Sequence, residues 1–261
     1  MKIELSKLVK TYPRAEKPAL DIAQLTLRGG TIHGILGHSG SGKSTLLNIL
    51  ALLDQPDART EAPLKFYQEP GEEPLSYQRK KIRGQEGKQY TLDQWRNQYY
   101  SFIFQSGYLL ENFSVLDNVL MPTTLQRSVT KDDIAQAEEA LLKLDIQKPL
   151  WDALPRHLSG GQYQRVAVVR SLAHNPRVLF ADEPTGSLDP RMGQKVMECL
   201  QEWREQDEEN LLILVTHNPE HVEQYCDRYT VLSSGEVILD GKKDQYDFLK
   251  VKKAMSGVKT K

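Results

Sequence analysis

Apolar and polar residues alternate along two stretches near the start of the chain, residues 3–10 and 23–27. This period of two predicts strands with one buried face. Four short apolar runs lack the alternation, which is typical of strands buried on both faces of a parallel sheet. These runs cover residues 31–36, 102–104, 178–181 and 211–215.

Helical periodicity occupies segments between these strands, at residues 44–53, 132–144, 162–173 and 192–205. Thr130 is placed as the N-cap of the second of these helices, and Pro190 precedes the last. Strands that alternate with helices predict an α/β fold. No repeat of 20–50 residues is present, which excludes solenoids and propellers.

Two segments break the pattern. Residues 54–100 are rich in Gln, Tyr, Pro and charged residues, and their periodicity is weak. We expect a solvated loop or a small added hairpin there. The alternative is a patch for nucleic acid or lipid headgroups, because four cations lie close together: Arg79, Lys80, Lys81 and Arg83. Residues 241–261 hold seven lysines and predict a frayed helix or a tail.

Composition narrows the class of protein. The 261 residues carry a formal net charge of −1, which argues against a protein that coats DNA. Two cysteines are too few for a disulfide scaffold and fit a reducing compartment. The first residues do not form a secretory signal, and the longest apolar runs are too short to span a membrane. We therefore expect a soluble chain whose membrane role, if any, comes from a partner.

The first chemical motif fits the pattern G-x-x-x-x-G-K-[ST] and lies between a predicted strand and a predicted helix. Glycines let backbone N–H groups surround a polyphosphate, and the positive end of the helix dipole faces it. We expect Lys43 to bridge the β and γ phosphates and Ser44 to ligate Mg²⁺. An ordinary Gly/Ser loop with a surface lysine is the alternative. The residues expected to bind the phosphates are Gly37, His38, Ser39, Gly40, Ser41, Gly42, Lys43, Ser44 and Thr45.

Two acids follow the apolar strand at residues 178–181. A carboxylate at the C-terminal end of a strand faces the ligand crevice of an open α/β sheet. We expect Asp182 to hold Mg²⁺ through water and Glu183 to polarise the attacking water. A solvated carboxylate at a strand end is the alternative, and the phosphate loop makes the functional interpretation stronger.

A second helix N-terminus suited to an anion follows Leu158. Ser159 is placed as its N-cap, and the glycines permit close approach of a ligand. The residues concerned are Ser159, Gly160, Gly161 and Gln162, and a plain Ser-Gly-Gly turn is the alternative.

The phosphate loop, Gln105, LSGGQ, the acid pair, Asp189 and His217 occur in an order that resembles the ATP-binding cassette (ABC) ATPases. The resemblance implies an α/β fold with a RecA-like P-loop NTPase core, an N-terminal antiparallel β portion and an inserted helical lobe. These would form a nucleotide-binding domain over about residues 1–240, with the helical lobe at about 106–164 and an atypical insertion at about 54–100. A Lys-rich C-terminal tail, residues 241–261, would follow the domain.

The resemblance also implies roles for individual residues. Tyr12 would stack on adenine, and Gln105 would contact Mg²⁺ and the attacking water. Asp189 would lie in a loop that crosses a dimer interface, and His217 would contact the γ-phosphate. ATP and Mg²⁺ are thus the implied cofactors. Glu183, His217, Lys43 and Gln105 would be catalytic, and the implied metal ligands are Ser44, Gln105 and Asp182.

In this family two cassettes pair head to tail, so that LSGGQ of one chain caps the γ-phosphate held by the other. A second copy is therefore an implied partner. The run from Ala181 to Asp189 resembles cassettes of the macrolide-efflux, lipoprotein-release and peptide-resistance transporters. Such a cassette works with an integral membrane permease on the cytoplasmic side of the inner membrane, and no nucleic acid is expected. Residues 54–100 depart from this group, because Gln105 follows Lys43 by 62 positions.

Of two other classes, only the first remains as the alternative. A soluble ABC ATPase could act in an assembly process such as iron–sulfur cluster assembly, without a membrane partner. Chromosome-maintenance and DNA-repair relatives carry long heptad insertions or zinc cysteines between the motifs, and neither occurs here.

Overall fold

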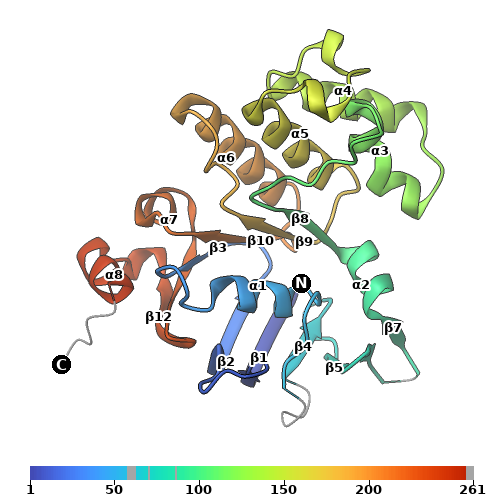
Figure 1. Ribbon diagram of the computed structural model, residues 1–261. Coiled ribbons are helices and arrows are strands. Elements are labelled where there is room, and N and C mark those ends of the chain that lie inside the picture. Colours follow the sequence, from blue (N-terminus) through green and yellow to red (C-terminus); the bar gives the residue numbers. More distant parts are fainter. Residues whose placement is uncertain (58–62, 70, 86, 257–261) are drawn as a thin grey trace.

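The computed structural model describes residues 1–57, 63–69, 71–85 and 87–256. Within these residues the strands form two six-stranded sheets, one mostly parallel and one antiparallel (Figure 1). The sheets face each other across helix α1, Lys43–Leu50, and the helices from α3 to α8 cover the other face of the mostly parallel sheet. The α/β fold predicted from the sequence is confirmed.

The mostly parallel sheet has the strand order β12-β11-β3-β10-β9-β8. Neighbours from β11 to β8 are parallel, and β12 is antiparallel to β11. Every residue of the central strand β10 is buried, which explains its unbroken apolar run. The strands are β3 Thr31–Leu36, β8 Tyr100–Ile103, β9 Val178–Asp182, β10 Leu211–Thr216, β11 Arg228–Ser233 and β12 Glu236–Lys242.

The antiparallel sheet has the order β2-β1-β4-β5-β6-β7. Its inner face packs on α1 and on the mostly parallel sheet, and its outer face is solvated, so buried and exposed residues alternate along β4 and β5. The strands are β1 Lys2–Lys10, β2 Leu20–Arg28, β4 Leu64–Tyr67, β5 Leu75–Gln78, β6 Lys81–Arg83 and β7 Gln89–Thr91.

Most of the helices begin with a side-chain cap. Thr130 caps α4 as the sequence predicts, and reciprocal capping boxes open α3, α4 and α5. On the face of the mostly parallel sheet opposite α1, the first helices in chain order are α3 Val115–Gln126, α4 Lys131–Lys143, α5 Gly160–Leu172, α6 Pro190–Glu205 and α7 Pro219–Tyr225. Two short 3-10 helices, η1 Lys148–Leu150 and η2 Pro155–His157, lie between α4 and α5.

Residues 54–100 are more than a loop or a single hairpin. They form β4 to β7 and helix α2, Leu92–Tyr99, and β4 pairs with β1 in the antiparallel sheet. Trp95 of α2 is fully buried against an aromatic cluster of Phe66, Tyr90, Tyr99 and Tyr100. Strands of three or four residues are too short to show a clear period, which is why the sequence pattern failed here. Residues 58–62, 70 and 86 lie outside the described residues.

The lysine-rich end is also folded over most of its length. Strand β12 continues to Lys242, and η3 Lys243–Gln245 leads to α8, Phe248–Met255. Val251 of α8 is fully buried, so this helix is part of the core rather than a free tail. Residues 257–261, with Lys259 and Lys261 among them, lie outside the described residues.

Candidate nucleotide-binding site

The predicted phosphate loop connects the C-terminal end of β3 to the N-terminus of α1. Gly42 adopts φ +104°, and a Cβ there would lie 2.8 Å from the Ala19 carbonyl oxygen. A Cβ at Gly37 would lie 2.4 Å from Ser41 Oγ. Only glycine, which has no Cβ, fits at positions 37 and 42. The backbone of the loop can therefore pass close to Ala19 and to Ser41.

The N-terminus of α1 is open to an anion. Within the described residues no side chain caps it, whereas a side chain caps each of the helices α3 to α6. Its first turn also lacks an acidic residue. The hydroxyl of Ser41, in the loop, is buried without a hydrogen-bond partner. Free N–H groups at a helix N-terminus together with an unpartnered hydroxyl fit the oxygens of a phosphate group.

The ammonium of Lys43 lies over this loop. Its Nζ donates to the carbonyl oxygens of Gly37 at 2.8 Å and His38 at 3.0 Å. Burial lowers the pKa of Lys43, whereas the charges of Glu183 and Asp182 raise it. The loop lysine and the acid pair are therefore close enough to interact electrostatically, although they are about 140 residues apart in sequence.

The two acids take different positions. Asp182 ends β9, where burial and the charge of Glu183 raise its pKa against the effect of Lys43. Glu183 has left-handed backbone geometry, φ 49°, and its N–H donates to the Val215 carbonyl oxygen at 3.0 Å. This geometry turns the chain away from β9 and fixes Glu183 beside the end of β10.

The carboxylate of Glu183 is held by His217. Glu183 Oε1 lies 2.8 Å from the backbone nitrogen of His217 and 2.6 Å from its ring Nδ1. The Glu183 side chain is 16% exposed and that of His217 is 76% exposed. The structure thus brings Lys43, Asp182, Glu183 and His217 into one cluster at the C-terminal ends of β3, β9 and β10.

Tyr12 contacts helix α1 through Thr45. Its hydroxyl is 3.4 Å from Thr45 Oγ1 and 3.1 Å from Asp54 Oδ2, and its ring is 39% exposed. Lys10 pairs with Asp54 at 2.6 Å and stands 4.9 Å from the centre of the Tyr12 ring. Lys10 and Asp54 hold this ring in place, and no signal in the sequence pointed to either of them.

Gln105 is exposed in a turn just after β8, and a fixed segment follows it. Gly107 and Tyr108 both have positive φ, and Arg170 of α5 donates to both of their carbonyl oxygens at 2.6 Å. The Tyr163 hydroxyl accepts the Leu109 N–H at 2.7 Å. Helix α5, which begins with the LSGGQ residues, is therefore clamped to the segment after Gln105.

The LSGGQ residues themselves stand apart from this cluster. Ser159 Oγ accepts the Gln162 N–H at 3.2 Å, and the Gln162 side chain accepts the Ser159 N–H at 2.8 Å. A Cβ at Gly160 would meet nothing within 4 Å. Asp189 caps α6 through the Met192 N–H. Within the part of the chain that the structure describes, no hydrogen bond or ion pair joins residues 159–162 to the phosphate loop.

Comparison with known proteins agrees with this geometry. Residues 20–186 match the family model described as "ABC transporter". The chain is 36% identical over 236 residues to the lipoprotein-releasing system ATP-binding protein LolD 1 of Rhodopirellula baltica, and the match covers 89% of this chain and 95% of that protein. It is 36% identical over 245 residues to the macrolide export ATP-binding/permease protein MacB of Chlorobium luteolum, covering 93% of this chain but only 34% of MacB.

The structural comparison gives the same class. The dimeric post-hydrolysis structure of the ATP-binding cassette MJ0796 bound to ADP and Pi has a TM-score of 0.75 and 30% identity, covering 94% of this chain and 100% of that one. The chain therefore belongs to the ABC transporter family and is an ATP-binding, ATP-hydrolysing cassette. None of the helices in its described residues is long and apolar enough to cross a membrane.

Proposed function

We propose that ATP binds across the phosphate loop, with its adenine on the ring of Tyr12. The backbone N–H groups of residues 37–45 and the ammonium of Lys43 would hold the phosphates. Two observations support this placement: the uncapped N-terminus of α1 and the buried, unpartnered hydroxyl of Ser41. Asp54 and Lys10 would keep the Tyr12 ring in position for stacking.

The proposed magnesium site takes oxygen donors from the phosphate loop and from the C-terminal ends of β9 and β8. The Ser44 hydroxyl, the Asp182 carboxylate and the Gln105 amide oxygen are hard ligands of the kind Mg²⁺ prefers. Among the described residues, no group of three His, Cys, Asp or Glu side chains forms a metal site by itself. The ion would therefore depend on phosphate oxygens and water, as is usual for Mg²⁺ at nucleotides. It would neutralise charge on the phosphates.

The position of Glu183 is the observation that carries the proposed mechanism. Its carboxylate is oriented by His217 and lies in the same cluster as Lys43 and Asp182. Glu183 would accept a proton from the attacking water, while Lys43 would stabilise negative charge on the transferred phosphate. His217 would position Glu183 and contact the γ-phosphate. This is positioning plus electrostatic stabilisation, which is how phosphoryl transfer is generally catalysed.

The separation of LSGGQ from the phosphate loop supports a second copy of the chain as partner. Ser159, its two glycines and Asp189 are exposed or half-buried, and within the described residues no hydrogen bond or ion pair joins them to the phosphate loop. In a head-to-tail dimer they would cap the γ-phosphate bound by the other copy. ATP would then join the two cassettes, and hydrolysis would release them.

An integral membrane permease is the second proposed partner. Three apolar side chains after Gln105 are strongly exposed: Tyr108 at 64%, Leu110 at 41% and Phe113 at 44%. Exposed apolar groups gathered on one segment indicate an interaction site, and this segment is clamped to the LSGGQ helix by Arg170. By similarity to LolD and MacB, the permease would be of the lipoprotein-release or macrolide-export type. The cassette would then act on the cytoplasmic side of the membrane.

Substitution of the proposed base tests this mechanism. We expect Glu183→Gln to reduce Mg²⁺-dependent ATP hydrolysis by about 10²–10⁴-fold while ATP binding survives, because the amide keeps the size of the side chain but cannot take a proton. Phosphate release and binding of a fluorescent ATP analogue would be measured together. Hydrolysis at the wild-type rate would remove Glu183 from this role.

Recovery from membranes tests the partner. Co-purification with a permease from detergent-solubilised membranes is expected for a transporter subunit. Recovery of the chain in the soluble fraction alone, with no membrane protein bound, would favour the assembly-process alternative.

A further inference from the structure

The hairpin of β5 and β6 presents a cluster of cations that the ATPase mechanism does not use. We propose that Arg79, Lys80, Lys81 and Arg83, the hairpin cations, bind the anionic headgroups of a lipid bilayer. The contact with lipid rests in part on the proposed permease partner, which would bring the hairpin toward the bilayer, but the binding itself needs no nucleotide and can be tested on the cassette alone.

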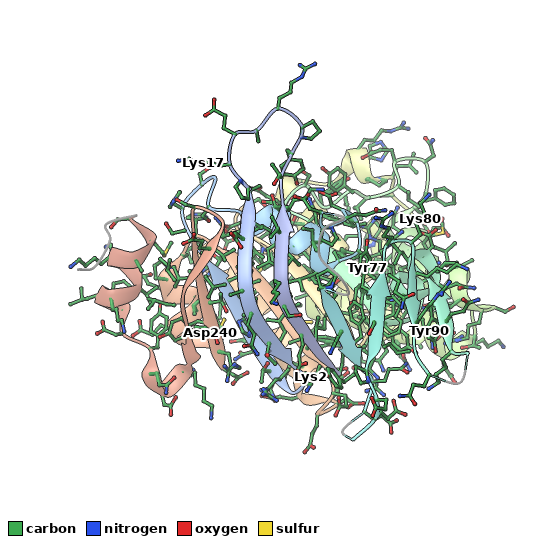
Figure 2. The ribbon with its side chains drawn as sticks, turned by 90° about the horizontal axis from the view of Figure 1, so that it is seen from below. Lys2, Lys17, Tyr77, Lys80, Tyr90 and Asp240 are labelled. Carbon is green, nitrogen blue, oxygen red and sulfur yellow. The ribbon has the colours of Figure 1, made fainter. Side chains whose placement is uncertain are left out.

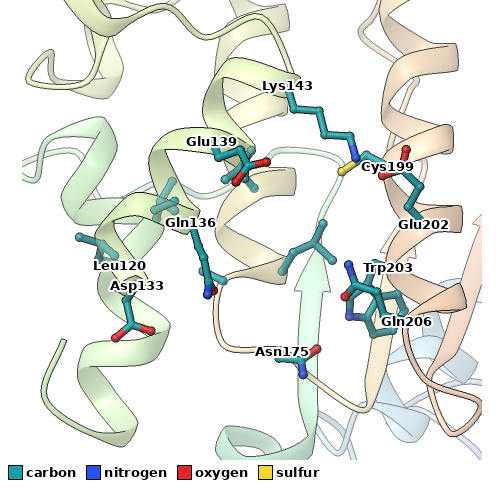
Figure 3. Close-up of a pocket in the computed structure, with 16 residues that line it drawn as sticks. Leu120, Asp133, Gln136, Glu139, Lys143, Asn175, Cys199, Glu202, Trp203 and Gln206 are labelled. Carbon is teal, nitrogen blue, oxygen red and sulfur yellow. Dashed lines mark hydrogen bonds and ion pairs between the residues drawn. The ribbon is translucent and has the colours of Figure 1, made fainter. Parts of the chain in front are cut away.

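The strand register places these side chains on the outer face of the antiparallel sheet. Ser76 pairs with Arg83, Tyr77 with Ile82, and Gln78 with Lys81. Leu75, Tyr77 and Ile82 are buried on the inner face, so Lys81 and Arg83 point outward, and Arg79 and Lys80 are exposed in the turn. Figure 2 shows this outer face, with Lys80 and Tyr90 at the edge far from Asp240.

The side chains paired across the strands with the outward cations Lys81 and Arg83 are uncharged. Within the described residues, none of the hairpin cations forms an ion pair. The outward positions beside them carry uncharged polar groups, namely Ser76, Gln78, Gln89 and Thr91. Among the described acids, Glu72 and Glu73 precede β5, so they lead into the Ser76–Arg83 end of the hairpin and not into the turn that holds Arg79 and Lys80.

The hairpin belongs to the side of the molecule that carries the proposed permease surface. Helix α2, which follows β7, is joined to α3 by a hydrogen bond from the Gln126 amide to the Asn97 carbonyl oxygen at 2.5 Å. In Figure 1, β5, β7, α2 and α3 lie on one side, and β12 and α8 lie on the opposite side. A cassette docked on a permease through the segment after Gln105 would therefore hold the hairpin near the bilayer.

A lipid surface fits this cluster better than a nucleic acid. Single strands bind by stacking bases on exposed aromatic rings, and the outward positions of β5 to β7 carry none. A cluster of about four to eight cations is the feature that attracts anionic lipids. Since the net charge of the whole chain is −1, the attraction must be local to the hairpin.

Vesicle sedimentation tests the proposal with the full-length chain. The probes are vesicles of phosphatidylcholine alone and vesicles with about one-third phosphatidylglycerol. We expect binding to the anionic vesicles only, and weaker binding as salt is raised. Each cation near such a surface contributes roughly fivefold to the partition coefficient, so Lys80→Gln, Lys81→Gln and Arg83→Gln together should weaken it about a hundredfold.

The other end of the chain offers a matched control. Lys250, Lys252 and Lys253 of α8 are exposed and form no ion pair within the described residues, and they lie on the opposite side of the molecule. Replacing these three with Gln removes the same charge and should leave vesicle binding within about twofold. Both triple variants should retain the wild-type rate of ATP hydrolysis, which shows that they are folded and separates this test from that of the proposed mechanism.

Three outcomes would overturn the proposal. The first is no binding of the wild-type chain to anionic vesicles at low salt. The second is equal loss of binding in the two triple variants, which would indicate net charge rather than a site. The third is tighter binding of the hairpin to a short RNA or DNA duplex than to the vesicles, at the same salt concentration.

Discussion

Glu183 and His217 are joined twice, because one carboxylate oxygen accepts from both the backbone nitrogen and the ring Nδ1 of His217, at 2.8 and 2.6 Å. The backbone contact does not depend on the side chain of residue 217. The ring contact does, and the second carboxylate oxygen, Oε2, accepts a longer hydrogen bond from Thr216 Oγ1 at 3.5 Å. His217 is thereby a positioning residue for the proposed base as well as a proposed phosphate contact.

Removing the imidazole should therefore impair hydrolysis more than binding. We expect His217→Ala to lower kcat by about tenfold to a hundredfold with little change in KM for ATP, because the hydrogen bonds from the backbone nitrogen of residue 217 and from Thr216 Oγ1 to the carboxylate remain. Steady-state phosphate release gives both constants. A large rise in KM with unchanged kcat would indicate that His217 acts mainly in ATP binding.

ATP-driven pairing is testable with the hydrolysis-deficient chain. We expect Glu183→Gln to shift from monomer to dimer when ATP is added, because the nucleotide would persist between the phosphate loop of one copy and LSGGQ of the other. Light scattering coupled to size exclusion gives the mass directly. The double variant Glu183→Gln, Ser159→Phe should stay monomeric, since Ser159 is exposed and bulk there would block the contact. A dimer in that variant would contradict the proposed geometry.

The phosphate loop provides a matched pair of glycines. Gly42→Ala should abolish ATP binding and destabilise the fold, because a Cβ would lie 2.8 Å from the Ala19 carbonyl oxygen at φ +104°. Gly40 also has positive φ, at +77°, but a Cβ there meets nothing within 4 Å. Gly40→Ala should then cost only about 1 kcal/mol of stability in thermal unfolding. Equal effects of the two substitutions would show that backbone conformation alone, rather than crowding, limits this loop.

The docking surface can be tested by placing charge on it. We expect Tyr108→Glu and Leu110→Glu to leave ATP binding intact and to weaken association with the permease, because a carboxylate would have to be desolvated at the interface. Ile238 is a matched control, since it is 41% exposed on β12, on the opposite side of the molecule. Co-purification yields would be compared. Full permease recovery with both surface variants would place the docking site elsewhere.

A buried histidine makes stability depend on pH. His33 of β3 is fully buried, and burial lowers its pKa from 6.5 to about 3. Its Nε2 lies 2.7 Å from Thr230 Oγ1. Below pH 6.5 the unfolded chain binds a proton that the folded chain does not, so the free energy of unfolding should fall as pH decreases toward 3. The expected slope from this group is at most about 1.4 kcal/mol per pH unit.

The measurement is urea unfolding between pH 5 and pH 8. His33→Gln has no titrating ring, so its stability should change less between these limits than that of the wild-type chain. Equal pH dependence in the two proteins would contradict the prediction and assign the effect to other groups.

The sequence determined those features that depend on local chemistry. Unbroken apolar runs such as residues 211–215 identified strands buried on both faces, and the capping residues Thr130 and Ser159 marked helix starts that the structure confirms. The family followed from motifs of a few residues, because binding a polyphosphate restricts a short backbone segment so strongly that the restriction is visible as glycines and one lysine.

Only the tertiary structure decided what depends on residues distant in sequence. The short strands of residues 64–91 form by pairing with β1 and by the burial of Trp95, neither of which leaves a period in the sequence. Asp54 and Lys10 contact Tyr12, the proposed adenine platform, although neither stood out in the sequence. Tyr163 and Arg170 bind the backbone of Leu109 and Gly107 because that segment lies beside α5. Contacts of this kind are set by packing between elements, so no local pattern of residue types predicts them.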